Sequence, residues 1–154
     1  KGVEVFNLLV GEPESLDPLK EESPDGWYVT GYPWSELKTP EHTKFLNAYQ
    51  AKFKDYPRLG SVVGYATVMS AAEAIKKAGS LDQEKLVAAM SGLKLITPFG
   101  MIEYRPIDHQ STMGAYVGQI GVKDGNGYMK NWRFVDGKDA LPSDADVQKM
   151  RPKN

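Results

Sequence analysis

The stretch PDGWYVTGYPWSELKTPEHTKF, residues 24 to 45, decides how the chain is organised. It opens with a strand-like run of aromatic and β-branched residues that breaks at Gly31. Tyr32 and Trp34 follow on either side of a proline, and a helix-start signal comes at Thr39. A short connection stiffened by proline therefore separates a predicted strand from a predicted helix.

The segment before this connection has the pattern of a strand, a short helix and a second strand. Residues 3 to 10 are rich in Val, Phe and Leu and predict a short buried strand. A brief helical turn is expected over residues 15 to 22, and residues 26 to 31 predict the second strand. Two strands around one short helical segment indicate a βαβ unit and an α/β fold.

The segment after the connection predicts three helices. Thr39 can cap the first, and Pro40 suits its first position because the missing N–H would be unpaired there. The spacing of apolar residues extends this helix to about residue 55 and predicts a second over residues 61 to 78. A serine-x-x-glutamine capping box opens a third helix within residues 80 to 92.

The C-terminal part changes to short β segments. Residues 99 to 105, 113 to 122 and 128 to 135 predict strands, and the last two are joined by a glycine-rich hairpin connection at residues 123 to 127. The polar tail, residues 136 to 154, is expected to be partly mobile. This β-rich end departs from the strict alternation of a simple doubly wound domain.

Composition narrows the class of protein. The 154 residues include 19 basic and 20 acidic side chains, so the net charge of −1 gives no electrostatic footprint for nucleic acid. The absence of cysteine excludes disulfides and thiolate sites but leaves the compartment open. No apolar run is long enough for a membrane span. The chain begins at Lys1 without methionine, which indicates processing or truncation.

The sequence gives little support for a catalytic site or a metal site. His42 and His109 have no second histidine or cysteine at ligand spacing, so no metal site is predicted. Asp108 could orient His109 for acid–base work with Ser61 or Ser111, which leaves a hydrolase as an alternative. The favoured interpretation is a polar loop in which Asp108 and His109 bond to the backbone.

Two places have features of a ligand site. Gly60 and Ser61 open the second predicted helix, where free N–H groups and the helix dipole can hold a carboxylate, although a plain helix cap is the alternative. Tyr32 and Trp34 follow the carboxyl end of a strand, where ligands bind in open α/β sheets. Ordinary packing of these aromatic side chains is the alternative there.

Three stretches in order carry a family resemblance. They are DGWYVTGYPW at residues 25 to 34, the segment from TPEHTKF to AIKKAG at residues 39 to 79, and TPFGMIEYRPIDHQSTMGAYVG at residues 97 to 118. The chain resembles the C-terminal part of bacterial periplasmic solute-binding proteins of the branched-chain amino acid type. The resemblance implies a type I periplasmic binding protein fold, in which two Rossmann-like lobes are joined by three crossings. It also implies a periplasmic receptor without enzymatic activity or cofactor, which delivers a small molecule to an ABC permease.

The resemblance divides the chain between the two lobes. Residues 1 to 31 would end the second lobe, and residues 32 to 38 would cross to the first. Residues 39 to 118 would form part of the first lobe, and residues 119 to 154 would return to the second lobe and end in the tail. The final crossing is expected near residues 118 to 123.

The resemblance also implies a ligand and its contacts. The start of the second helix at Gly60 and Ser61 matches a ligand-contacting region, with Tyr65 one turn further on. Glu12 lies roughly where amino-acid binders place an acidic residue. With Tyr32 and Trp34 as aromatic walls, the expected ligand is an amino acid or an aromatic carboxylate.

The resemblance covers less than half of a usual family member, so the chain is expected to be a fragment. The main serine and threonine contacts to the ligand would come from the missing N-terminal half. Unpaired sheet edges and exposed apolar faces should make the chain marginal unless that half, or a second copy by swapping, covers them. A sensory domain of the same fold and an interaction module that uses its sheet edges are the alternatives.

Overall fold

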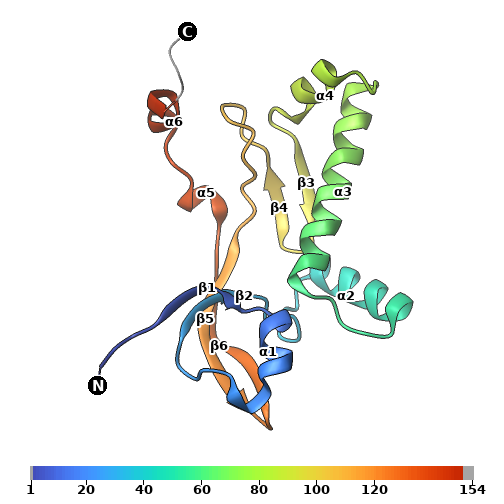
Figure 1. Ribbon diagram of the computed structural model, residues 1–154. Helices are drawn as coiled ribbons and strands as arrows, with labels where there is room; N and C mark the ends of the chain where they lie inside the picture. Colours follow the sequence, from blue (N-terminus) through green and yellow to red (C-terminus); the bar gives the residue numbers. More distant parts are fainter. Residues whose placement is uncertain (1, 151–154) are drawn as a thin grey trace.

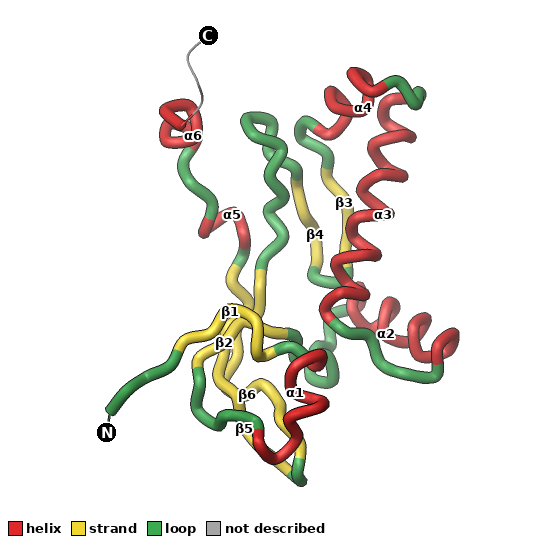
Figure 2. Tube along the Cα trace, viewed as in Figure 1, coloured by secondary structure: helices red, strands yellow, loops and turns green. Residues whose placement is uncertain are grey.

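The computed structural model describes residues 2 to 150 and arranges them as two bodies around a narrow waist (Figure 1). We call the four-stranded sheet with its short helix α1 the sheet body, and helices α2 to α4 with a separate β-hairpin the helical body. Figure 2 shows the strands gathered in the sheet body and the hairpin lying along helix α3.

The sheet body begins with the predicted βαβ unit. Strand β1 (Phe6–Gly11) leads into helix α1 (Pro13–Leu19) and a 3-10 turn (Lys20–Glu22), and strand β2 (Tyr28–Gly31) follows. The two strands pair in parallel, as the pattern predicted. Two parallel neighbouring strands must be joined by a crossover connection, and here that crossover is helical.

The prediction that residues 3 to 10 form a buried strand was wrong in part. The strand exists, but Phe6, Leu8 and Leu9 expose 71%, 76% and 65% of their surface. β1 is the edge strand next to β2, and the described residues leave these three side chains largely uncovered. The expectation of exposed apolar faces is therefore confirmed for the described residues.

The hairpin at the C-terminal side completes the sheet. Strand β5 (Ala115–Lys123) pairs antiparallel with β2 and with strand β6 (Asn126–Val135), which gives the order β1-β2-β5-β6. Asp124 and Gly125 join the two strands with φ values of 51° and 74°. Two residues with positive φ are typical of a tight hairpin turn, so the predicted connection is confirmed.

The helical body begins as the sequence indicated. Helix α2 (Pro40–Phe53) has Thr39 at its N-cap, and the Thr39 hydroxyl accepts the His42 N–H at 3.4 Å. Helix α3 (Leu59–Ala78) ends at Gly79, which has the left-handed conformation that suits glycine. Both helices have nearly the predicted extent, although Phe53 and Val68 of their apolar residues are exposed.

Two predicted caps are displaced. Helix α3 begins before Ser61, so this serine lies inside its first turn instead of capping it. Helix α4 (Gln83–Met90) is capped by Asp82, whose carboxylate accepts the Lys85 N–H at 3.1 Å. Ser80 lies outside the helix and accepts the Asp82 N–H, so it does not form the predicted capping box.

The remaining elements connect the helical body to the tail. Strands β3 (Lys94–Thr97) and β4 (Gly100–Glu103) form the separate hairpin. The tail contains two short helices, α5 (Gly137–Ala140) and α6 (Asp144–Met150), of which the sequence had predicted neither. Residues 151 to 154 of the tail lie outside the described residues.

The two bodies share one hydrophobic core. Its buried members come from both of them, from the crossing segment and from the turn between β3 and β4: Leu16, Val29, Tyr32, Leu37, Val62, Phe99, Tyr116, Ile120 and Met129. The waist in Figure 1 is therefore filled with packed side chains.

The close approach of β1 and β2 at their carboxyl ends generates a prediction. A Cβ atom on Gly31 would lie 2.0 Å from the carbonyl oxygen of Gly11, so Gly31→Ala must displace backbone. We expect this variant to lose about 1–3 kcal/mol of unfolding free energy, as measured by urea denaturation.

Gly64→Ala is the matched control for this substitution. Gly64 lies in α3 with nothing within 4 Å of its Cβ position. The control should gain about 0.5–1 kcal/mol because alanine is the better helix former. Equal denaturation midpoints for the two variants would contradict this account of the strand contact.

Candidate site at the junction of the two bodies

Tyr32 is the first residue of the crossing segment and lies in the core. Its side chain is 2% exposed, and its hydroxyl is 2.6 Å from Nε2 of His42, which is fully buried at the start of α2. The Tyr32 ring also packs against Phe99 at a centroid distance of 5.5 Å. Tyr32 therefore anchors the crossing segment to the helical body, and nearly all of its ring is buried.

Burial controls the protonation of this pair. It raises the pKa of Tyr32 well above its usual range, with smaller contributions from Tyr116 and Glu14. Burial lowers the pKa of His42 most strongly. A hydrogen bond with the Leu37 backbone raises it, and the positive charge of Lys38 lowers it further. Both side chains are therefore neutral near pH 7, so their hydrogen bond requires no buried charge.

Trp34, two residues further on, belongs to an aromatic stack. Its ring lies parallel to the Tyr56 ring, with centroids 4.3 Å apart and an interplanar angle of 5°. The guanidinium carbon of Arg58 is 4.0 Å from the centre of the same Tyr56 ring. Since Trp34 covers one face, Arg58 must cover the other, and Tyr56 lies between an indole and a cation.

The acidic side of the junction comes from α1. Asp17 pairs with Arg58 at 3.2 Å, and the Gly60 N–H donates to the Glu14 carboxylate at 3.0 Å. The carboxylate at the amino end of α3, where the sequence analysis expected that of a ligand, thus belongs to the protein itself. Glu12 is the N-cap residue of α1, but its side chain makes no capping hydrogen bond. Burial, together with the nearby Glu14 charge, raises the pKa of Glu12.

Ser61 and Tyr65 lie further along α3 in different surroundings. The Ser61 hydroxyl accepts the Arg58 N–H at 3.3 Å and donates to the Tyr49 hydroxyl at 3.4 Å. The Tyr65 ring is 43% exposed and packs edge-on against Phe45. Tyr65 lines a groove of about 470 Å³ on the helical body, whose other walls are Pro40, Glu41, Lys44, Phe45, Ala48, Ile96, Thr97 and Pro98.

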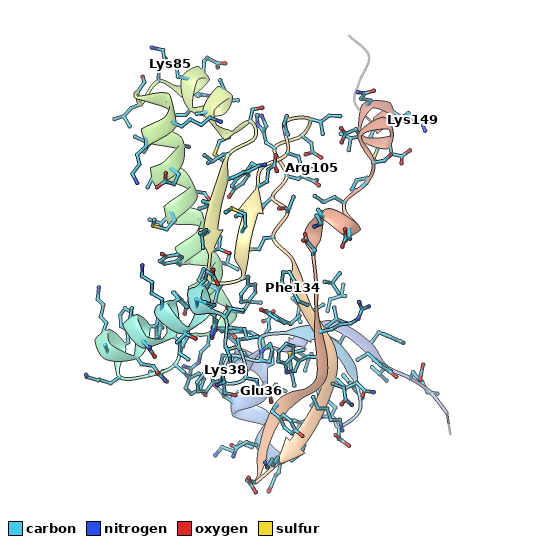
Figure 3. The ribbon with its side chains drawn as sticks, turned by 180° about the vertical axis from the view of Figure 1, so that it is seen from behind. Glu36, Lys38, Lys85, Arg105, Phe134 and Lys149 are labelled. Atoms are coloured by element: carbon cyan, nitrogen blue, oxygen red, sulfur yellow. The ribbon has the colours of Figure 1, made fainter. Side chains whose placement is uncertain are left out.

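A second, smaller crevice lies beside the crossing segment. Its lining combines α1, the crossing and the start of β6: Pro13, Leu16, Asp17, residues 32 to 36, Gly127, Tyr128 and Met129. Glu36 is one of these lining residues, and its carboxylate accepts the Trp132 indole N–H at 2.5 Å. In the view from behind, Glu36 and Lys38 lie together below Phe134 of β6 (Figure 3).

The structure thus divides the six predicted site residues among four places. Tyr32 and Trp34 share the crevice, Gly60 and Ser61 lie at the amino end of α3, Tyr65 faces the groove, and Glu12 is the N-cap residue of α1. Sequence reasoning missed the residues that join the first two places, which are Glu14, Asp17, Tyr56 and Arg58. The spacing of two carboxylates three residues apart on a short helix was the available signal.

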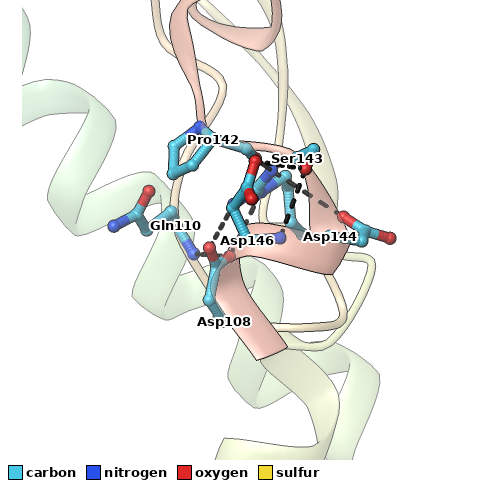
Figure 4. A network of polar contacts seen from close by, with 7 residues as sticks. Asp108, Gln110, Pro142, Ser143, Asp144 and Asp146 are labelled. Carbon is cyan, nitrogen blue, oxygen red and sulfur yellow. Dashed lines mark hydrogen bonds and ion pairs between the residues drawn. The ribbon is translucent and has the colours of Figure 1, made fainter. Parts of the chain in front are cut away.

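The carboxylate of the hydrolase alternative bonds to groups other than the predicted triad partners. Asp108 receives hydrogen bonds from the Arg105 guanidinium and from the Gln110 N–H (Figure 4). Arg105 also donates to the Pro142 carbonyl at 2.7 Å, so this carboxylate belongs to a network that holds the tail. The bond from the Gln110 N–H is the backbone contact that the favoured polar-loop interpretation predicted for Asp108, and Ser111 accepts the Met113 N–H.

The described residues can also be searched for a metal site and for a membrane-spanning helix. Between residues 2 and 150, His, Asp and Glu side chains nowhere gather in threes as a metal site would require. Within the same range, none of the helices has both the length and the apolar character for a membrane crossing.

The fold and the junction define an α/β protein of two bodies linked by crossing segments. A family model described as periplasmic binding protein matches residues 1 to 126. The chain belongs to this family, whose members are not enzymes, and the resemblance seen in the sequence is confirmed.

Solved structures of similar proteins share this fold. A branched-chain amino acid ABC transporter protein from Rhodopseudomonas palustris is 24% identical with a TM-score of 0.73, and the match covers 89% of this chain and 37% of that protein. An amino acid ABC transporter substrate-binding protein from Pseudomonas fluorescens is 19% identical with a TM-score of 0.75, covering 94% of this chain and 39% of that protein.

A third similar structure contains an aromatic ligand. It is an ABC transporter solute-binding protein from R. palustris in complex with 3,4-dihydroxybenzoic acid, 25% identical with a TM-score of 0.66. The match covers 88% of this chain and 38% of that protein. The chain therefore has part of the type I periplasmic binding protein fold and spans less than two fifths of these relatives.

The buried histidine makes stability depend on pH. Folding lowers the pKa of His42 from 6.5, so the unfolded chain takes up its proton at a higher pH than the folded chain. The unfolding free energy should therefore decrease as the pH falls below about 6.5. Urea denaturation at about pH 7.5 and about pH 5.5 measures this loss.

His42→Gln should remove most of this pH dependence, although the variant starts from a lower stability. His109→Gln is the matched control, because it removes the other histidine of the chain. An unchanged pH dependence in the His42 variant would show that this side chain is not its source.

The aromatic stack can be tested by a double-mutant cycle with Trp34→Ala, Tyr56→Ala and the double variant. Parallel rings at 4.3 Å should give a coupling of about 0.5–1.5 kcal/mol in unfolding free energy. A cycle that pairs Trp34→Ala with Tyr28→Ala is the control, because Tyr28 stacks on Phe6 instead. Additive effects in the Trp34 and Tyr56 cycle would contradict the stack.

Proposed function

We propose that this chain is part of a periplasmic receptor that binds a small carboxylate between its two lobes and delivers it to an ABC permease. Family membership supports this proposal, together with solved relatives whose names specify amino acid transport or a bound aromatic acid. The ligand class is accordingly an amino acid or an aromatic carboxylate.

The observation that carries the proposal is the position of a positive wall at the junction. Arg58 and the amino end of α3 face α1 across the boundary between the two bodies. Backbone N–H groups at a helix start and a guanidinium are the groups that hold carboxylates. In this arrangement Glu14 and Asp17 occupy them, and a ligand carboxylate would compete for the same donors.

The crossing at residues 32 to 38 would serve as part of the hinge. It leaves the sheet body after Gly31 and reaches the helical body before Pro40. The return crossing was expected near residues 118 to 123. Because β5 already pairs with β2 at Tyr116, we place the return just before Ala115.

Calorimetric titration of the full-length protein with leucine and with 4-hydroxybenzoate tests the proposal. We expect saturable binding of one of these two classes, with a gain of about 2.7 kcal/mol in unfolding free energy at 100 times the dissociation constant. Failure to bind any amino acid or aromatic acid would overturn the proposed ligand class.

Arg58→Gln supplies a sharper version of the same experiment. Removing the guanidinium should weaken binding of a carboxylate ligand at least tenfold, which is about 1.4 kcal/mol. Arg133→Gln on β6 makes the same change of charge at an exposed position and is the matched control. Equal affinities in the two variants would exclude Arg58 from the ligand site.

A further inference from the structure

Two acidic side chains on α1 face the start of α3 across the junction. Glu14 and Asp17 are three residues apart, a spacing that places them on one face of a helix. Their partners, Gly60 and Arg58, are more than 40 residues away along the chain, and the Glu14 contact joins positions 46 apart. These contacts therefore link separate bodies and not neighbouring turns.

Arg58 is held in place before it meets α1. Its guanidinium donates to the Asp55 carboxylate at 2.8 Å and to the Tyr56 carbonyl at 2.6 Å, and it lies over the Tyr56 ring. A side chain fixed by three contacts loses little further rotamer freedom when it pairs with Asp17. The ion pair across the junction is therefore more favourable than one between two free surface side chains.

Tyr56 gives this side of the junction a further contact to α1. Burial raises the pKa of Tyr56 to about 12, and a hydrogen bond to Asp17 adds to the shift. The other face of its ring is covered by Trp34 of the crossing segment. Asp17 thus contacts both the Arg58 guanidinium and the Tyr56 hydroxyl. The crossing segment supports these contacts through the stack of Trp34 on Tyr56.

The Glu14 contact adds the dipole of a long helix. Helix α3 has 20 residues, and its amino end has partial positive charge and N–H groups without helical partners. The Glu14 carboxylate accepts one of these N–H groups at 3.0 Å. Both contacts place negative charge of α1 against positive charge of the helical body.

We propose that Glu14 and Asp17 of α1, with Gly60 and Arg58 of the helical body, form an electrostatic clamp that holds the two bodies at their present separation. The clamp lies at the edge of the junction, whereas the shared core lies at its centre. Breaking it lets the bodies part about the core. Its role in admitting a solute rests on the proposed function, but the clamp itself requires no ligand.

Distance measurement between two spin labels tests the clamp without any ligand. The chain has no cysteine, so Lys123→Cys at the β5–β6 turn and Asn47→Cys on α2 introduce the only thiols within it. Both positions are exposed, and one belongs to a strand of the sheet body and the other to a helix of the helical body. The full-length protein is used, with any cysteine outside this chain replaced by serine.

The clamp variant combines Glu14→Gln with Asp17→Asn, which remove charge and retain side-chain volume. We expect its distance distribution to be broader and shifted to a longer mean than that of the unaltered protein. The control combines Glu21→Gln with Glu22→Gln, which remove two negative charges from the adjacent exposed turn. The control should keep the original distribution.

Salt provides a second measurement that needs no substitution in the clamp. Raising NaCl from about 0.05 M to about 1 M shortens the screening length to about 3 Å and should shift the unaltered protein toward the distribution of the clamp variant. Distributions that remain the same in both comparisons would overturn the proposal. Failure to bind a solute, with the distance shift present, would count against the proposed function alone.

Discussion

A chain of aromatic contacts through Tyr32 determines how the two bodies meet. Tyr32 is bonded to His42 of α2, and its ring packs on Phe99 in the turn between β3 and β4. Phe99 packs edge-on against Tyr116 of β5, which in turn packs against Trp132 of β6. One crossing residue therefore connects the helical body to the far strand of the sheet through side chains that are mostly buried.

This core explains why the junction has two kinds of contact. Packed rings at the centre resist separation, since voids there forfeit dispersion contacts and buried area. Charged contacts at the edge weaken with salt and tolerate water, so they can break while the centre stays closed. If the packed rings at the centre stay together while the charged contacts at the edge break, the two bodies can rotate about the centre as about a hinge. Trp34 belongs to the edge, where its stack on Tyr56 supports the charged contacts.

The sequence predicted what local chemistry determines. Pro40 after a capping threonine, and Asp124 with Gly125 between two strands, fix their helix start and turn through backbone preferences of a few residues. The pairing of Glu14 with Gly60 could not be predicted in this way, because it depends on a contact across 46 positions. Tyr32 was ambiguous for the same reason, since an aromatic residue after a strand suits a ligand wall and a core equally.

The exposed strand β1 shows where local pattern and the present structure differ. Phe6 and Leu8 alternate with Asn7 and Leu9, so apolar side chains occur on both faces. That composition is typical of a strand covered on both sides in an α/β sheet. In the described residues Phe6 finds only the Tyr28 ring, stacked at 4.8 Å, and stays 71% exposed. Since the chain spans 37% of the similar R. palustris protein, we expect the part of that fold outside this chain to cover β1, which would reconcile a buried-strand pattern with an exposed strand.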